Sequence, residues 1–413
     1  MARQKWLSCA LVVTIAVITC GGLPVAQAAQ PVKIGVPIEL SGEFGVYGEA
    51  LKQGTELALK EINAAGGILG RPVEAIYADI ESKVQPTIDK VTALIQRDNV
   101  DVLIGIISSA SRDAVVPVVF REKKILIYPT TYEGGVAAKF KDTGAHYVFT
   151  TGPVSEQYIK PFIPWLIKNK GKSFYMLGMD YIYGQGSVEN AKKYVAAAGG
   201  TVVGSELIPL GTTDFSAVLN RVVAAKPDIL FAVEAGDDLL YLVKQYNEFD
   251  LRGKNIFFAT SELDESYMKA IGADNVKGIA CSYPYFMVLD TPENQKFLAD
   301  MRALYGPDVL ASLATESQYY SVKLFAQAAQ KAGSLDTEAL ISALETASIV
   351  APEGKILIRK EDHQAIVNDI IAVIEPDANQ PYAKWFKIQE RIESIEPELQ
   401  GMLYSTAPQT GTK

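Results

Sequence analysis

Two short runs of hydroxyl-bearing residues follow apolar segments and carry the most useful polar chemistry of the chain. The run 108–111 (SSAS) follows VDVLIGI, and the run 130–133 (TTYE) follows KILIYP. Hydroxyls and the free N–H groups of a helix start suit a small ligand with a carboxylate or carbonyl oxygen, because each contact is a hydrogen bond. We therefore predict a binding site that includes Ser109, Thr130 and Tyr132.

Each of these residues also has a purely structural interpretation. Either Ser109 or Ser111 can cap a helix that begins at Arg112, and TTYEGG can form a turn that contacts no ligand. Pro129 favours an extended approach to Thr130 and removes a competing backbone donor.

The second half of the chain offers one tyrosine and two carboxylates at comparable positions. Tyr183 precedes the helix start GQG, where its ring can close over a ligand. Glu234 ends the apolar run DILFAV, and Glu262 follows NIFFA. Either carboxylate can receive an ammonium or an amide N–H. The alternatives are a surface aromatic for Tyr183 and solvated helix caps for the two glutamates.

Catalytic and metal-binding patterns are missing from the sequence. Of its two histidines, His146 lies beside an expected strand and His363 lies in the charged stretch RKEDH. There is no HExxH, CxxC, GxSxG, GxGxxG or GxxxxGK[ST] motif, so we expect no enzyme activity, no metal and no cofactor. The net charge of −9 argues against nucleic acid or an anionic membrane as a partner.

Apolar runs alternate with amphipathic helical segments over most of the 413 residues, a pattern typical of parallel α/β sheets. A first group of strands is expected near 32–39, 73–79, 101–107, 124–129 and 146–150, and a second near 173–178, 201–207, 228–233 and 255–259. Helices are expected at 184–198, 214–225, 237–248, 291–305 and 314–332.

The chain then crosses between the two groups near GIACSYPYF (278–286) and again near 354–359, before a strand at 368–375. We therefore predict two doubly wound parallel-sheet lobes joined by three hinge crossovers. Lobe 1 comprises residues 29–150 and about 282–356, and lobe 2 comprises 151–281 and about 357–390. Residues 391–413 are expected to form a loosely held C-terminal tail.

The first 28 residues have the pattern of an export signal. Arg3 and Lys5 form a basic start, an apolar run follows, and AQA at 26–28 is a cleavage site of small residues. The alternative is a lipoprotein box in which Cys20 is acylated. Removal of this segment leaves Cys281 alone, so we expect no internal disulfide and a buried thiol in an exported protein.

With these residues in place, the chain resembles the type I periplasmic solute-binding proteins of ABC importers, in the branch that binds leucine, isoleucine and valine or amides and urea. The resemblance covers roughly 31–390. The segments that carry it are IGVPIELSGEFGVYGEALKQGTELALKEINAAGGILGRPVE, the turn at 108–111, YPTTYEG, MDYIYGQG and TTGPVSEQ.

The resemblance implies a role for each candidate residue. Ser109 matches the serine of the first lobe that holds the ligand carboxylate or carbonyl, and Thr130 and Tyr132 match the next strand end. Tyr47 matches the lid tyrosine of the first lobe, and Tyr183 the tyrosine of the second. Glu234 and Glu262 are both candidates for the acid that receives an amino group.

Two departures bear on the ligand. Ser108 stands where some amino-acid binders have a cysteine, and Tyr132 replaces a small hydroxyl residue. These changes favour a small amide, urea or unusual amino acid over a branched aliphatic one. The resemblance implies a monomeric periplasmic receptor that delivers its solute to the permease subunits of an ABC importer. The alternative is a regulatory receptor that senses amides or amino acids.

Overall fold

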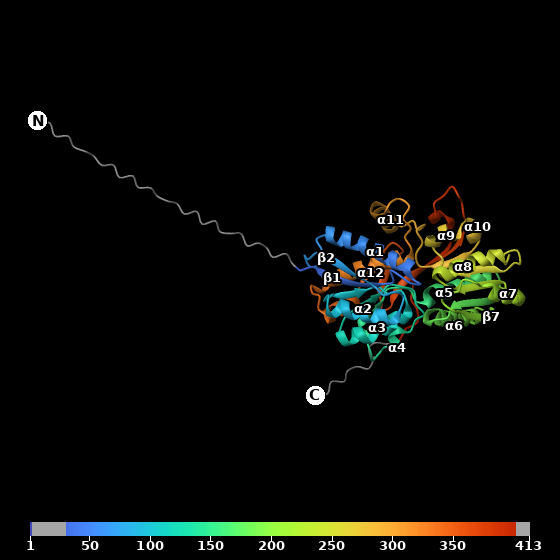
Figure 1. The fold of residues 1–413 in the computed structure, drawn as a ribbon, viewed down its shortest axis with the longest axis horizontal. Helices are drawn as coiled ribbons and strands as arrows, with labels where there is room; N and C mark the ends of the chain where they lie inside the picture. The colour runs from blue at the N-terminus through green and yellow to red at the C-terminus, as the bar shows by residue number, and fades with distance from the viewer. Residues whose placement is uncertain (2–29, 402–413) are drawn as a thin grey trace.

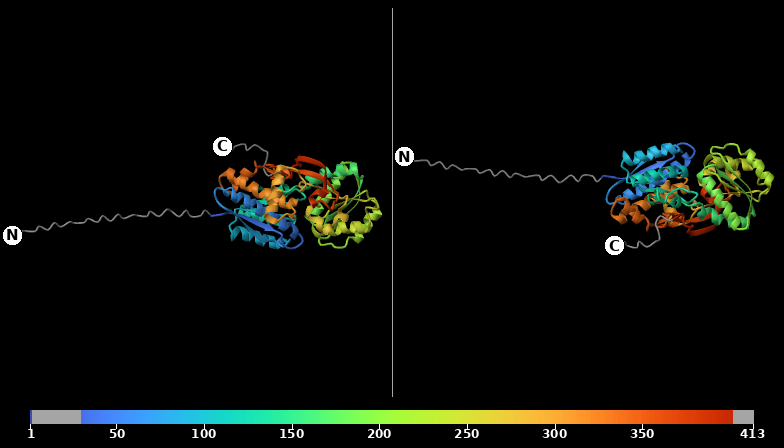
Figure 2. Two further views of the ribbon diagram at one scale, coloured as in Figure 1. Left: turned by 90° about the horizontal axis from the view of Figure 1, so that it is seen from above. Right: turned by 90° about the horizontal axis from the view of Figure 1, so that it is seen from below.

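The computed structural model describes residue 1 and residues 30–401, so the predicted export signal and Cys20 lie outside the described residues. Figures 1 and 2 show two lobes side by side: one is built mainly from the first 150 residues and a later helical segment, the other from the middle of the chain. No helix of the described part is long and apolar enough to cross a membrane.

The first lobe is built on a five-stranded parallel sheet in the order β2-β1-β3-β4-β5. Its strands are β1 (Val32–Ile38), β2 (Val73–Asp79), β3 (Val102–Ile104), β4 (Leu126–Tyr128) and β5 (Val148–Thr150). The helices between them are α1 (Gly45–Ala64), α2 (Val84–Gln96), α3 (Ser109–Glu122) and the short α4 (Val136–Lys139). Strands β1, β3, β4 and β5 are almost wholly buried because the sheet is covered on both faces, whereas β2 at its edge is only partly buried.

The second lobe repeats this arrangement with parallel strands in the order β7-β6-β8-β9-β10. These strands are β6 (Ser173–Met179), β7 (Thr201–Ile208), β8 (Ile229–Val233), β9 (Phe257–Thr260) and β10 (Ala280–Tyr283). The helices are α5 (Ser155–Asn169), α6 (Ile182–Ala197), α7 (Ser216–Ala225), α8 (Gly236–Glu248), α9 (Met268–Ile271) and α10 (Ala273–Val276). The predicted α/β class with two doubly wound sheets is confirmed.

The last third of the chain joins the two lobes. Its elements are α11 (Pro292–Tyr305), α12 (Leu313–Ala332), α13 (Thr337–Leu344), β11 (Ser348–Ala351), β12 (Gly354–Ile358), β13 (Ala365–Ile374) and β14 (Phe386–Ile395). The start of β13 pairs with β12, and its second half pairs antiparallel with β10 of the second lobe. One long strand therefore links the two halves, and the second sheet becomes antiparallel beyond β10.

The prediction of a loose tail is wrong for the residues that the structure describes. Strand β14 pairs along β13 from Ile374 to Val367, and the Arg359 guanidinium donates to the carbonyl oxygens of Pro397 and Glu398. Gly135 N also donates to the Gln400 side chain at 3.0 Å. The polar composition of this strand misled the prediction, because most of its side chains face solvent at a sheet edge.

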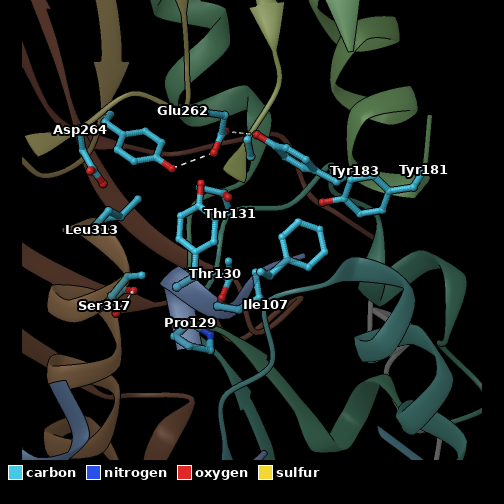
Figure 3. A pocket seen from close by; sticks show the side chains of 15 residues that line it. Ile107, Pro129, Thr130, Thr131, Tyr181, Tyr183, Glu262, Asp264, Leu313 and Ser317 are labelled. Atoms are coloured by element: carbon cyan, nitrogen blue, oxygen red, sulfur yellow. Dashed lines mark hydrogen bonds between the residues drawn. The ribbon is translucent and has the colours of Figure 1, made fainter. Parts of the chain in front are cut away.

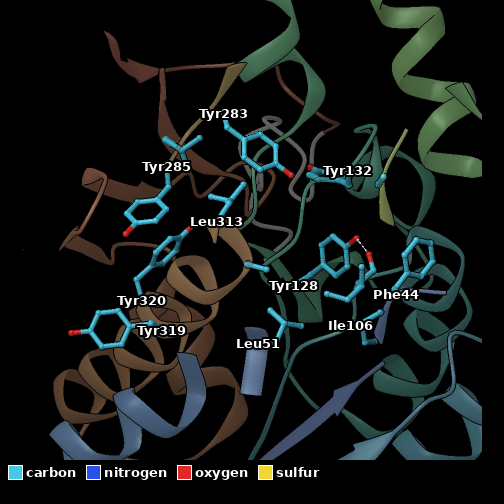
Figure 4. Close-up of a cluster of buried hydrophobic side chains, with 14 of the residues drawn as sticks. Phe44, Leu51, Ile106, Tyr128, Tyr132, Tyr283, Tyr285, Leu313, Tyr319 and Tyr320 are labelled. Carbon is cyan, nitrogen blue, oxygen red and sulfur yellow. Dashed lines mark hydrogen bonds between the residues drawn. The ribbon is translucent and has the colours of Figure 1, made fainter. Parts of the chain in front are cut away.

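Aromatic side chains dominate the core near the junction of the lobes (Figure 4). Tyr128 and Tyr132 meet edge to face with ring centroids 6.1 Å apart, and both are fully buried. Each buried phenol finds an acceptor: Tyr128 donates to Ile107 O at 2.6 Å, and Tyr320 donates to Thr151 O at 2.6 Å. These bonds satisfy polar groups that would otherwise be costly to bury.

Helices α1 and α12 approach so closely that Gly54 leaves no room for a side chain. A Cβ atom at Gly54 would lie 2.2 Å from Thr315 O. We expect Gly54→Ala to lower the free energy of unfolding by ~1–3 kcal/mol, because overpacking outweighs the ~1 kcal/mol of helix propensity that alanine adds. Urea denaturation measures this change.

Gly45→Ala is the matched control on the same helix, since its Cβ would meet nothing closer than Leu40 O at 3.6 Å. This variant should be as stable as the parent or more stable. Equal effects of the two substitutions would contradict the packing argument.

Candidate functional site

A pocket lies between the lobes, at the carboxyl ends of strands from both parallel sheets (Figure 3). It holds about 500 Å³ of space including its open mouth. Such a position is where open α/β sheets bind their ligands. The first lobe and α12 contribute Phe44, Tyr47, Ile107, Pro129, Thr130, Thr131, Leu313, Ala314 and Ser317. The second lobe contributes Tyr181, Tyr183, Ala235, Glu262, Asp264 and Tyr283.

Glu262 is the main polar group on the second-lobe side of the pocket. It lies two residues beyond the end of β9 and is 3% exposed. Its two carboxyl oxygens accept hydrogen bonds from the phenols of Tyr183 and Tyr283, the latter at 2.8 Å (Figure 3). Burial raises the pKa of Glu262 to about 8, although both phenols oppose the shift. This pKa favours the protonated form of the carboxyl at neutral pH.

Asp264 places a second carboxyl in the same pocket, two residues further along the chain. It is buried, and Oδ1 accepts from Ser266 N at 2.8 Å. Burial raises the pKa of Asp264 to about 6, against the hydrogen bonds from Ser266. The second-lobe side of the pocket is therefore acidic.

Tyr47 connects the two lobes at the edge of the pocket. Its hydroxyl is hydrogen-bonded to the hydroxyl of Tyr267, and Gly236 N donates to both oxygens, at 3.2 and 2.8 Å. Because Tyr47 belongs to α1 and the other two residues follow β8 and β9, these bonds form only when the lobes are closed on one another.

Several hydrogen-bond donors on the first-lobe side are already used within the protein. Thr130 lines the pocket, but its hydroxyl donates to Ile106 O at 2.9 Å. Ile107 N and Ser108 N both donate to the buried carboxyl of Glu39, at 3.0 and 3.1 Å. Burial raises the pKa of Glu39 to about 7, while these backbone bonds lower it. Glu39 thus occupies the N–H groups just before α3.

Ser109 lies just behind the pocket and takes part in a buried ionic network. Its hydroxyl donates to Glu133 Oε2 at 2.7 Å and accepts from Arg112 Nη1 at 3.3 Å. The cap of α3 is Ser108, whose Oγ accepts from Ser111 N, and the helix begins at Ser109. The predicted cap at Ser109 or Ser111 and the predicted helix start at Arg112 are therefore wrong.

Tyr132 and Glu234 also lie outside the lining. The Tyr132 hydroxyl donates to Gln364 at the hinge crossover and is fully buried. Glu234 is buried with no hydrogen-bond partner for either carboxyl oxygen. Burial, with the nearby charge of Asp238, raises its pKa well above the usual range. The pocket thus brings together Tyr47, Thr130, Tyr183 and Glu262 of the seven predicted residues.

Comparison with known proteins gives the family. The model of the periplasmic binding protein family matches residues 31–379. The chain belongs to this family. Membership makes it a solute-binding protein of ABC transporters rather than an enzyme, and places it in the periplasm.

Two curated relatives of this periplasmic binding protein illustrate the match. It is 25% identical over 349 residues to the Leu/Ile/Val-binding protein homolog 6 of Brucella melitensis, covering 83% of this chain and 87% of the relative. It is 24% identical over 339 residues to the leucine-, isoleucine-, valine-, threonine-, and alanine-binding protein of Pseudomonas aeruginosa, covering 80% and 86%.

Solved structures share the fold of this periplasmic binding protein. An ABC transporter substrate-binding protein from Sphaerobacter thermophilus superimposes with a TM-score of 0.80 at 27% identity, covering 91% of this chain and all of that one. A solute-binding protein from Rhodopseudomonas palustris in complex with 3,4-dihydroxybenzoic acid has a TM-score of 0.80 at 22% identity, covering 89% and 98%.

Sequence reasoning missed several lining residues of this binding protein. Tyr181 lies two residues before the predicted Tyr183, and Asp264 lies two residues after the predicted Glu262. Including the residues two positions away from each predicted contact would have found both. Leu313 and Ser317 come from the first turn of α12, far along the chain, and no local signal marks them.

The described residues contain no group of three or more histidine, cysteine, aspartate or glutamate side chains able to hold a metal ion. Cys281 is a free, fully buried cysteine on β10, as the sequence predicts.

Proposed function

We propose that this binding protein closes its two lobes around one short amide, urea or amino acid and delivers it to the permease of an ABC importer. The observation that carries the proposal is the pocket between the lobes, bounded by strand ends of both sheets and bridged by Tyr47, Tyr267 and Gly236. A ligand that contacts both lobes stabilises the closed state, because its contacts exist only there.

The proposal includes a role for each predicted residue. Tyr47, Thr130, Tyr183 and Glu262 line the pocket and are the proposed direct contacts. Ser109, Tyr132 and Glu234 are proposed to act through neighbours, Ser109 through Glu133 and Tyr132 through Gln364. The protein is further proposed to work as a monomer, after removal of an export signal at residues 1–28.

The named ligands of similar proteins support a small polar solute. The curated relatives are named for leucine, isoleucine and valine, and one solved structure contains a dihydroxybenzoic acid. These ligands are compact, which suits a pocket enclosed between two lobes.

Thermal unfolding of the dialysed protein against a panel of amides, urea, amino acids and small aromatic acids tests the proposal. A solute at 100 times its dissociation constant should stabilise the folded protein by about 2.7 kcal/mol and raise the midpoint visibly. Stabilisation by one chemical class supports a receptor for that class. No stabilisation by any amide, urea or amino acid would contradict the ligand classes proposed.

A further inference from the structure

We propose that the pocket selects a compact organic cation that lacks a carboxylate, such as a guanidinium, an amidinium or a short alkylammonium. This inference rests on the solute-binding function above and, for the same pocket, favours cations such as the charged isosteres of urea and of short amides over the neutral molecules. Three features of the lining carry it: its charge, its aromatic rings and the state of its hydrogen-bond donors.

The charge of the lining is acidic only. Glu262 and Asp264 lie in the pocket, and none of its fifteen lining residues is lysine, arginine or histidine. The nearby Arg112 does not compensate, because its guanidinium is paired with Asp113 at 2.8 Å and with Glu133 at 2.7 Å. A ligand that brings a positive charge supplies the missing counter-charge.

Aromatic rings surround these carboxyls. Phe44, Tyr47, Tyr181, Tyr183 and Tyr283 all line the pocket, and the centroids of Phe44 and Tyr181 are 6.0 Å apart. Several ring faces around one small space favour a desolvated cation, which the negative faces of the rings attract. Pro129, Ile107 and Leu313 close the opposite side with apolar surface (Figure 3).

On the first-lobe side of the pocket, the donors of residues 107 to 109 and of Thr130 are engaged within the protein, and the Thr131 hydroxyl is the remaining side-chain donor of this strand end. The Ser109 hydroxyl donates to Glu133, the Thr130 hydroxyl donates to Ile106 O, and the N–H groups of residues 107 and 108 donate to Glu39. A ligand carboxylate would therefore lie beside Glu262 and Asp264 without these partners. Amino acids and carboxylic acids are disfavoured for this reason.

The protonation of Glu262 predicts that the affinity for a cation depends on pH. The titratable groups that interact with it are Asp264 and the phenols of Tyr47, Tyr158, Tyr181, Tyr183, Tyr267 and Tyr283, and none of them is basic. A cation favours the ionised carboxylate, so its binding releases the proton from the Glu262 carboxyl. Its affinity should then rise with pH up to about 8.

Isothermal titration calorimetry with isosteric pairs tests the inference. Guanidinium at millimolar concentration is compared with urea, and acetamidinium with acetamide, since the members of each pair differ in charge and little in shape. We expect each cation to bind at least tenfold more tightly than its neutral partner. At pH 7 it should release close to one proton, seen as a dependence of the heat on the buffer, and glycine and acetate should not bind.

Variants assign the effect to the pocket. Glu262→Gln keeps the size of the side chain but cannot ionise, so it should weaken the cations at least tenfold, weaken the neutral isosteres much less and abolish proton release. Glu248→Gln removes one exposed carboxylate at the end of α8 and is the matched control, with no expected change.

The outcomes separate this inference from the proposed function. Equal or tighter binding of urea, acetamide or an amino acid overturns the cation preference and leaves the receptor function intact. Cation binding without proton release or without sensitivity to Glu262→Gln overturns the site. Absence of binding by every probe also overturns the inference. Thermal unfolding against the larger set of solutes described above then tests the solute-binding function separately.

Discussion

Arg112→Met should lower the free energy of unfolding by ~3–5 kcal/mol, the usual cost of breaking a buried ion pair by removing one partner. Arg112 is 1% exposed, and its guanidinium contacts the carboxylates of Glu133 and Asp113. It also lies over the rings of Tyr128 and Tyr132, at 5.0 and 5.1 Å from their centroids. Burial opposes its charge, but the surrounding negative charges outweigh this effect and raise its pKa.

The loss should be large because Glu133 would remain without its cation. Asp113 keeps Lys139 at 2.5 Å, whereas Glu133 keeps only the Ser109 hydroxyl among these contacts. Glu133 also accepts from Asn190 and Ser155 through its carbonyl oxygen, at 3.1 and 3.2 Å, so the disturbance reaches the second lobe. Urea denaturation followed by circular dichroism measures the change.

Arg121→Met on the same helix is the matched control. Arg121 contacts only its neighbour Glu122 and its side chain is 60% exposed, so its removal should leave the midpoint unchanged. Similar losses for both variants would show that the effect comes from the helix and not from the buried network.

Glu316→Gln should stabilise the protein at pH 8 by more than ~1 kcal/mol, the equivalent of one pKa unit, with a smaller gain at pH 5. Glu316 lies in the first turn of α12 and is fully buried. Its Oε1 accepts from Glu353 N at 3.2 Å, while its Oε2 and both carboxyl oxygens of Glu353 have no hydrogen-bond partner. Burial raises the pKa of both glutamates, and each carboxyl disfavours ionisation of the other.

The sign follows from proton binding. A carboxyl with a raised pKa in the folded state binds more protons there than in the unfolded chain, so the free energy of unfolding falls as pH rises above about 4.5. Glutamine cannot ionise, and its amide can donate to Glu353. The gain over the parent should therefore grow between pH 5 and pH 8.

Urea denaturation at several pH values provides the test, with Glu74→Gln as the control. Glu74 is exposed on β2, and its substitution should not alter the pH dependence. A Glu316→Gln variant that is less stable than the parent at pH 8 would show that the carboxylate has a role that its burial does not reveal.

Local sequence patterns predicted most elements of this fold. Strand β2 occupies the expected residues 73–79, and α12 begins one residue before the expected position. Alternation and helical periodicity of apolar residues show which face of each element is buried. They can therefore be interpreted without knowing which other elements pack against that face. The same logic placed Thr130 and Glu262 at strand ends, where both now line one pocket.

The sequence by itself determined the two parallel sheets, the order of their elements and the edge at which polar groups gather. Only the tertiary structure decided which of those groups remain open to a ligand. Glu133 takes the hydroxyl of Ser109, Glu39 takes the N–H groups before α3, and β14 completes a sheet that composition alone did not predict. These outcomes depend on competition among partners far apart in the chain, and a local pattern carries no information about such competition.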